Sequence, residues 1–233
     1  NLDGPSVLQI KPDLPKNQTN ITDCIFENEL PKEFITPRPP EKGAITLTNG
    51  CLILKGSEAP LSSVDSRNIL VRRQTAFCFD AECDFLVPDL KEGQEAGLTC
   101  YYDENTWVCF FVSKQNDNYF LQIREHIGTE DIYHERKEVE NPIGCKYLFG
   151  VHTEYLRRSF YYRKLAKTQE ESCVQNADVS NENCEMQTLP NVYYLCDEGI
   201  RMGKRFTGAM VGIYGYGGGE ELFITFTDFR YKE

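Results

Sequence analysis

Paired acidic side chains are the first residues whose type and spacing could do chemistry. A glycosidase needs two carboxylates about 5–10 Å apart across a cleft, and two acidic clusters occur, Asp80-Ala-Glu82-Cys-Asp84 and Glu135-Arg-Lys-Glu138-Val-Glu140. The first cluster alternates along a predicted strand whose other face is apolar, which is typical of a solvated outer face. Basic residues interrupt the second cluster, which indicates a charged strand end. The sequence therefore predicts no independent catalytic site, and we expect that the chain alone is not an enzyme.

Histidine and cysteine spacings give no metal or nucleophile site either. The chain has three histidines and no Cys-x-x-Cys pair, so zinc-finger and thioredoxin-type sites fail on spacing. No Ser/His/Asp or Cys/His constellation is visible, and we expect no cofactor. A structural calcium ion near the chain ends, with Asp23 and Asp228 as conceivable ligands, is left open.

An aromatic hairpin, GLTCYYDENTWVCFFV at residues 97–112, could instead bind a sugar. Sugars stack their C–H patches on exposed aromatic rings and hydrogen-bond to neighbouring amides or carboxylates. We expect the turn at Asp-Glu-Asn-Thr, which places Tyr102, Asn105 and Trp107 around the tip. Tyr216, beside three glycines, is a further exposed candidate.

The same turn predicts the register of the hairpin. It places Tyr102 opposite Trp107 and Cys100 opposite Cys109, so that these four side chains share one face with Leu98. Directly opposed cysteines could close a cross-strand disulfide after a small adjustment. Because both faces of the hairpin are apolar, a core position for Trp107 is the alternative to a sugar platform.

The cysteine count indicates an oxidising compartment. The chain has ten cysteines, and two N-glycosylation sequons begin at Asn17 and Asn20 in a proline-rich stretch. We therefore expect a secreted glycoprotein stabilised by disulfides. A second predicted pair, Cys173–Cys184, would staple an inserted loop at about 166–190 that breaks the strand pattern.

Net charge limits the partners. The formal charge of −11 argues against nucleic acid and against an anionic membrane surface, and no apolar run of about 18 residues could span a bilayer. Because the chain starts at an asparagine and not at a methionine, we expect a mature or trimmed product. Glycans, other proteins and cations stay open as partners.

Short alternating segments predict an all-β fold. Residues 1–43, with many prolines and few periodic hydrophobics, are expected to form an extended arm or linker, and residues 44–233 a single sandwich. Apolar residues from Phe77 to Val87 occupy every second position, as in a half-buried antiparallel strand. Further strands are expected at 118–124, 131–139, 146–154, 156–164, 191–196, 209–215 and 222–231.

Several segments, taken in order, resemble one known module. They are Thr36-Pro-Arg-Pro-Pro40, Leu52-Ile-Leu-Lys-Gly56, Leu70-Val-Arg-Arg-Gln74, Gln94-Glu-Ala-Gly-Leu98, Tyr101-Tyr-Asp-Glu-Asn105, Phe206-Thr-Gly-Ala-Met-Val-Gly-Ile-Tyr214 and Thr227-Asp-Phe-Arg-Tyr231. Together they resemble the C-terminal concanavalin A-like sandwich of glycoside hydrolase family 43 β-xylosidases and α-arabinofuranosidases. The resemblance implies a jelly-roll module that is usually cysteine-poor, whereas this chain has ten cysteines. In those enzymes an N-terminal five-bladed propeller carries the catalytic carboxylates.

The resemblance also implies a role and a contact. A phenylalanine of the family sandwich reaches the sugar pocket of the propeller, and Phe206, flanked by Arg205, is the matching residue here. We therefore expect a secreted, non-catalytic carbohydrate-associated module, which binds a glycan or a glycosidase propeller. The alternative is an extracellular structural or assembly protein that uses the sandwich as a block and attaches or self-assembles through its arm.

Overall fold

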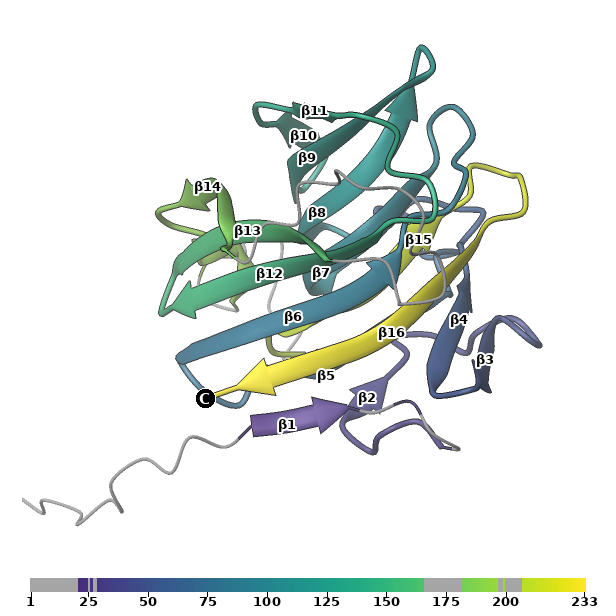
Figure 1. The fold of residues 1–233 in the computed structure, drawn as a ribbon. Helices are drawn as coiled ribbons and strands as arrows, with labels where there is room; N and C mark the ends of the chain where they lie inside the picture. Colours follow the sequence, from purple (N-terminus) through teal and green to yellow (C-terminus); the bar gives the residue numbers. More distant parts are fainter. Residues whose placement is uncertain (1–20, 25, 27–28, 166–181, 197–198, 200–206) are drawn as a thin grey trace, which may run out of the picture.

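The molecule is built from two antiparallel β-sheets (Figure 1). The computed structural model describes residues 21–24, 26, 29–165, 182–196, 199 and 207–233. The first sheet has the order β14 (Cys184–Leu189), β13 (Arg157–Leu165), β12 (Lys146–Glu154), β6 (Cys78–Leu86), β16 (Phe223–Lys232), β4 (Cys51–Lys55) and β3 (Ile45–Thr48), with β1 (Ile21–Cys24) also on β16.

The second sheet packs behind the first. Its order is β10 (Glu130–Tyr133), β9 (Asn118–Ile127), β8 (Thr106–Gln115), β7 (Glu95–Asp103), β15 (Met210–Tyr216), β5 (Ile69–Arg73) and β2 (Phe34–Ile35), with β11 (Lys137–Val139) on β9. The predicted all-β antiparallel sandwich is confirmed. One expected strand, 191–196, is instead a short 3₁₀ turn, η1 (Tyr193–Leu195).

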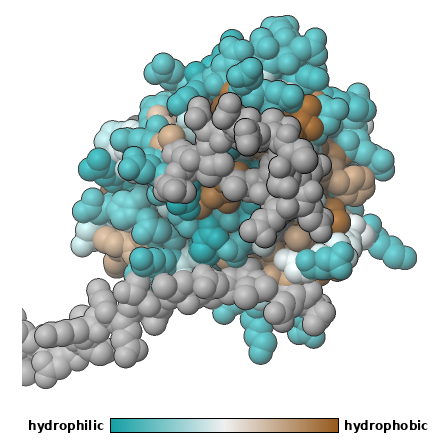
Figure 2. All heavy atoms as spheres, viewed as in Figure 1, coloured by the Kyte–Doolittle hydropathy of each residue, from teal (hydrophilic) through white to brown (hydrophobic). Residues whose placement is uncertain are grey.

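The core lies between the sheets and follows the predicted alternation. Phe79 and Phe85 of β6 point inward and are buried, and the Phe110 ring of β8 stacks on Phe149 of β12 with centroids 4.2 Å apart. Each fully buried side chain of this size stabilises the fold by about 1.5–3 kcal/mol. Phe77 differs from the prediction: it precedes β6 and is 79% exposed. The outer side seen in Figure 2 is largely hydrophilic.

The sandwich already includes residues that precede the predicted boundary at 44. β1 pairs with the end of β16, and β2 pairs with β5. Phe26 and Phe34 are buried in the core, and Phe34 meets Phe229 edge to face at 5.1 Å. Two isolated phenylalanines therefore anchor a segment that has no strand-like periodicity. At the other predicted irregular region, 166–190, the described part contributes β14, which pairs with β13.

The β7–β8 hairpin has a register one residue away from the prediction. Tyr101, not Tyr102, lies opposite Trp107, and Cys109 lies opposite Thr99, with an irregularity between Tyr101 and Asp103. A shift of one residue moves every side chain of a strand to the other face. Cys100 accordingly points into the inter-sheet core, whereas Cys109 belongs to a cluster on the outer side of the second sheet.

The eight cysteines whose side chains the structure describes are free thiols. Cys100 and Cys109 lie on opposite faces of the sheet, so the predicted disulfide between them is wrong. Cys83 is fully buried on β6 and faces other apolar side chains. Disulfide stabilisation is thus not seen, and hydrophobic packing holds this part of the fold. Cys184 is also a free thiol, so the predicted Cys173–Cys184 disulfide is not seen; Cys173 itself lies outside the described residues.

Candidate functional sites

The tip of the β7–β8 hairpin is braced from two sides. Asp103 Oδ1 accepts a hydrogen bond from the backbone N–H of Asn105 at 2.7 Å, which folds the turn back on itself. From the N-terminal part, Arg38 donates to Glu104 Oε2 at 2.9 Å and to the Tyr101 hydroxyl at 3.4 Å. Asn105 is half-buried in this arrangement. The tip is a packed corner and not an open platform.

The aromatic sugar-binding candidates of the hairpin are buried. Tyr102 and Trp107 are each 1% exposed, Tyr102 between the sheets and Trp107 on the outer side of the second sheet. The Trp107 ring stacks on His126 at 4.9 Å, and the Arg124 guanidinium lies 5.1 Å from its centroid. Neither ring presents a face to solvent. Tyr216 is half-buried and packs against the same outer cluster as Trp107.

A buried ion pair that the sequence did not predict lies next to Trp107. Arg124 donates to both oxygens of Glu95, at 2.8 and 2.7 Å, and the Tyr214 hydroxyl donates to the same carboxylate at 3.0 Å. Burial raises the pKa of Glu95, which Arg124 opposes. A small cavity of ≈230 Å³ lies beside the pair. One carboxylate held by three hydrogen bonds cannot serve as an acid–base pair, so this site positions strands. The residues are 29 apart, and no local pattern joins them.

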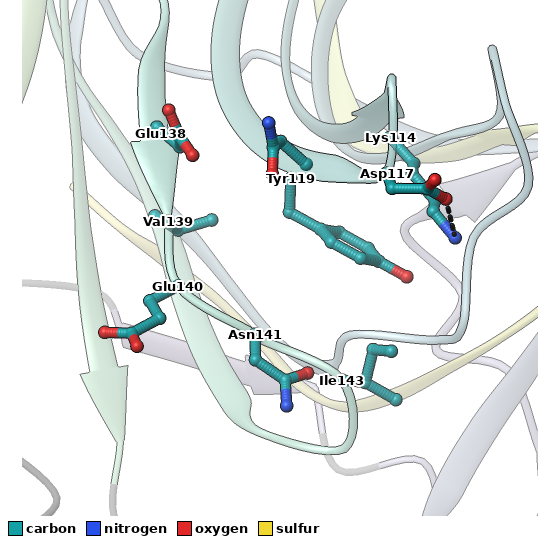
Figure 3. Close-up of a pocket in the computed structure, with 9 residues that line it drawn as sticks. Lys114, Asp117, Tyr119, Glu138, Val139, Glu140, Asn141 and Ile143 are labelled. Carbon is teal, nitrogen blue, oxygen red and sulfur yellow. Dashed lines mark ion pairs between the residues drawn. The ribbon is translucent and has the colours of Figure 1, made fainter.

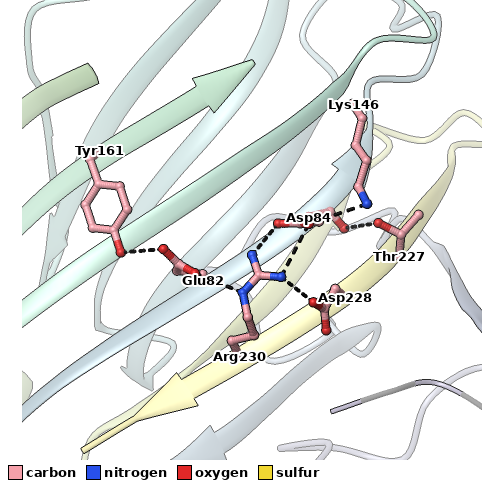
Figure 4. A network of polar contacts seen from close by, with 7 residues as sticks. All are labelled: Glu82, Asp84, Lys146, Tyr161, Thr227, Asp228 and Arg230. Atoms are coloured by element: carbon pink, nitrogen blue, oxygen red, sulfur yellow. Dashed lines mark hydrogen bonds and ion pairs between the residues drawn. The ribbon is translucent and has the colours of Figure 1, made fainter. Parts of the chain in front are cut away.

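Glu82 and Asp84 of β6 form a network on the outer side of the first sheet (Figure 4), whereas Asp80 of the same strand lies 2.7 Å from His152 Nδ1. Arg230 of β16 donates to Glu82 at 2.9 Å and to Asp84 at 2.6 Å, and it also contacts Asp228. Tyr161 donates to Glu82 at 2.9 Å. Asp84 is only 5% exposed, so the predicted solvated face is partly a buried salt-bridge network. Because the Arg230 guanidinium binds the carboxylates of Glu82, Asp84 and Asp228, none of these three is left as a free catalytic acid.

The calcium hypothesis has no support from this network. Asp228 is bonded to Arg230, and burial raises its pKa, which disfavours the ionised form that a calcium ligand needs. The side chain of Asp23 lies outside the described atoms. Over the described ranges, no three His, Cys, Asp or Glu side chains are grouped to hold a metal ion.

One open pocket is acidic (Figure 3). It has a volume of ≈540 Å³ and is lined by Lys114, Asp117, Tyr119, Glu138 and Glu140 among others. The Tyr119 ring points into it, but its hydroxyl already donates to Asp89 at 3.1 Å and accepts from the backbone of Leu90. Its acids are exposed and solvated, so this pocket offers no built site for a ligand.

An apolar pocket lies at the end of the sandwich where β5, β6 and β15 have their termini. Its volume is ≈510 Å³, and we call it the end pocket; it is lined by residues 73–77, 155–156, 158, 192, 195–196 and 208–209. At its mouth the Phe77 and Tyr155 rings stack at 6.0 Å with an interplanar angle of 19°. They are 79% and 65% exposed, and Leu156 and Tyr193 are 44% and 42% exposed. These four side chains form what we call the end patch.

The end patch is an exposed aromatic surface at a place that the sequence did not predict. The predicted exposed aromatic side chains were those of the hairpin tip and Tyr216. Phe77 looked like core because it continues the alternation of β6, and Tyr155 looked like an ordinary turn residue. Tyr155 has a positive φ of 52° and donates its backbone N–H to the Phe77 carbonyl at 2.7 Å, which fixes the two rings side by side. The predicted contact residues Arg205 and Phe206, and the sequon residues Asn17 and Asn20, lie outside the described residues.

Comparison with known proteins decides the family. The sequence model of the family described as the beta xylosidase C-terminal concanavalin A-like domain matches residues 25–232. The chain belongs to this family. The resemblance found in the sequence is thereby confirmed, and the family is that of an accessory sandwich found in xylosidases, separate from the catalytic propeller.

Solved structures share the same fold. The sandwich superposes on the xylan beta-1,4-xylosidase of Bacillus halodurans C-125 with a TM-score of 0.76 at 22% identity, covering 95% of this chain and 41% of that one. The GH43 protein BlXynB of Bacillus licheniformis gives a TM-score of 0.76 at 23% identity, covering 94% and 40%. A protein described as functionally unknown from Saccharomyces cerevisiae gives 0.55 at 10% identity, covering 86% and 94%.

A curated relative matches in sequence over part of the chain. A putative beta-xylosidase of Escherichia coli K12 is 32% identical over 112 residues, which are 47% of this chain and 20% of that protein. The family sandwich thus spans about two fifths of the length of the xylosidase structures it matches. In the described part of the chain, no helix has the length and apolarity needed to cross a bilayer.

Proposed function

We propose that this chain is the accessory sandwich of a family 43-type glycosidase and docks against a catalytic propeller through the end patch. The observation that carries the proposal is the exposure of four large apolar side chains, Phe77, Tyr155, Leu156 and Tyr193, at the end pocket and beside it. Contiguous exposed apolar groups mark interaction surfaces in soluble proteins. The chain itself performs no catalysis in this account.

Two further observations support a propeller as the occupant. In the xylosidase structures, about three fifths of the chain lies outside the matched sandwich, so a large neighbour adjoins the family domain there. Gly208 and Ala209 line the same end as the patch. In the sequence, the carried-over contact residue Phe206, which lies outside the described residues, is followed two positions later by Gly208.

The alternative role as a structural block keeps one supporting observation. The yeast protein with this fold is covered over 94% of its length, so such a sandwich also exists as nearly a whole protein. Assembly by strand exchange of the arm is less favoured, because β1 already occupies the edge of β16 in its own sheet. Secretion, with glycosylation of Asn17 and Asn20, remains part of our proposal, and an endoglycosidase-sensitive mass shift of the natural protein would test it.

The docking proposal is tested by sedimentation velocity with the Bacillus halodurans xylosidase expressed without its own sandwich. We expect the chain to form a one-to-one complex with it. The double variant Phe77→Ser/Tyr155→Ser should bind at least about tenfold more weakly, since aromatic anchors dominate interface energies. The matched control is Ile132→Ser/Tyr133→Ser on β10, where both side chains are also exposed. Equal losses in both double variants, or none, would contradict docking through the end patch.

A further inference from the structure

The end pocket contains polar groups that the chain leaves unpaired. Arg158 lines it from β13 and is only 3% exposed, yet its Nε has no hydrogen-bond partner among the described residues. Its other nitrogens donate to the backbone carbonyls of Tyr155 at 2.7 Å and Arg157 at 3.0 Å, and to Gln74 Oε1 at 3.3 Å. Gln74 Nε2 also lacks a partner in the described ranges. The buried guanidinium therefore has only neutral hydrogen-bond acceptors there.

Among the described residues that line the end pocket, the charged side chains are both cationic, Arg73 and Arg158, although the whole chain carries −11. Arg73, the second guanidinium of the pocket, donates to the backbone carbonyl of Thr207 and forms no ion pair within the described segments. Of the described acids, Glu233 reaches the rim, where its carboxylate accepts a hydrogen bond from the Thr75 hydroxyl. Burying a guanidinium without a carboxylate is unfavourable, and a carboxylate bound beside it would offset part of that cost.

The apolar walls suit a ring. The Phe77 and Tyr155 side chains stand at the mouth with large exposed surfaces, and Leu156, Val192 and Leu195 line the pocket behind them. The volume of ≈510 Å³ falls in the range of small-molecule sites, about 300–1,000 Å³. An aromatic wall with a few convergent polar groups is the usual construction of a saccharide site.

We propose that the end pocket binds a hexuronic-acid residue of a saccharide. The carboxylate lies against Arg158 and Arg73, the C–H face of the pyranose ring lies on Phe77 and Tyr155, and a ring hydroxyl accepts from Gln74 Nε2. A uronic acid combines the two features that the pocket offers, a negative charge and a sugar ring. This binding goes beyond the proposed docking function and does not depend on it. Because both use the Phe77 and Tyr155 rings, a docked propeller and a bound saccharide would compete for them.

The test is a titration of the isotope-labelled full chain, followed by backbone amide NMR shifts, with three probes. Glucuronate supplies ring and charge, glucose the ring alone, and acetate the charge alone. We expect glucuronate to bind at least about tenfold more tightly than either of the others, because charge-assisted hydrogen bonds and ring stacking act together. The shifts should centre on residues 73–77, 155–158 and 208–209.

Variants distinguish the pocket from general surface charge. Arg158→Met should weaken glucuronate binding by about tenfold or more, and Arg73→Gln and Tyr155→Ala, at exposed positions that do not threaten folding, by about threefold or more. Arg157→Gln is the matched control, since it removes the same charge from the exposed neighbour of Arg158 and should leave binding unchanged. If Arg158→Met fails to fold, the two exposed variants still decide.

Four results would overturn the proposal. Equal affinities for glucuronate and glucose would make the pocket a neutral sugar platform. Equal affinities for glucuronate and acetate would make it a seat for acidic side chains of a protein partner. An equal loss in Arg157→Gln and Arg73→Gln would assign the effect to surface charge. Absence of any shift at concentrations of tens of millimolar would exclude a site.

Discussion

The Glu95–Arg124 pair allows the sharpest test of how the second sheet is held. Glu95→Gln keeps the shape of the side chain but removes the charge that Arg124 meets at 2.7 and 2.8 Å. The side chains are 8% and 11% exposed, so the variant leaves an uncompensated cation in a nearly dry site. Breaking one partner of such a pair costs about 3–5 kcal/mol. At this chain length, that predicts a fall in Tm of about 6–20 °C.

The assay is urea unfolding followed by far-UV circular dichroism, run as a double-mutant cycle. Arg124→Met alone should also destabilise the fold. It leaves the Glu95 carboxylate without its cationic partner and removes the guanidinium that lies over the Trp107 and Phe111 rings. The double variant should recover most of the loss, with a coupling energy of at least about 2 kcal/mol. Glu130→Gln, at an exposed position of β10, is the control and should change stability by less than about 0.5 kcal/mol. Additive single effects would refute the pairing argument.

Three further predictions concern the strands and the thiols. Gly97→Ala should destabilise by about 1–3 kcal/mol, since a Cβ would lie 2.2 Å from the Phe110 carbonyl oxygen; a urea midpoint equal to wild type would contradict this. Ellman's reagent should modify exposed Cys78 in the native chain, and Cys83 and Cys109 only after unfolding without reductant; a disulfide at either buried cysteine would refute the packing described. Burial raises the pKa of Cys109 from 9.0 to about 12, so the folded state keeps a proton that the unfolded state loses. Stability should therefore fall as pH rises from about 9 towards 12, and Cys109→Ser should flatten that dependence.

Sequence periodicity predicted the sandwich because most of its strands carry a clear two-residue repeat. Phe79, Ala81, Cys83 and Phe85 alternate with polar side chains, and the structure buries all four. The same reasoning gave the wrong register for the β7–β8 hairpin, where every residue of β7 is buried. When both faces of a strand are apolar, the pattern cannot fix the register, and the irregularity after Tyr101 then decides it.

Contacts between distant segments explain the remaining differences. Phe26 and Phe34 join the core from a stretch that has no periodicity, so only tertiary packing makes them part of the fold. Phe77 and Tyr155 are far apart in the sequence, and only the fold brings these two exposed rings together. Whether the Nε–H of Arg158 finds a partner depends on the groups that surround it in the fold, and the sequence does not show which groups these are.

Hydroxyl-radical footprinting of the complex tests the central claim, docking through the end patch, most directly. It compares oxidation of exposed aromatic side chains in the free chain and in the mixture with the propeller part of the Bacillus halodurans xylosidase. Our account predicts protection of Phe77, Tyr155 and Tyr193, with Tyr133 and Phe223 oxidised as before, since all five are exposed in the free chain. Protection of Tyr133 or Phe223 with the end patch still oxidised would contradict it.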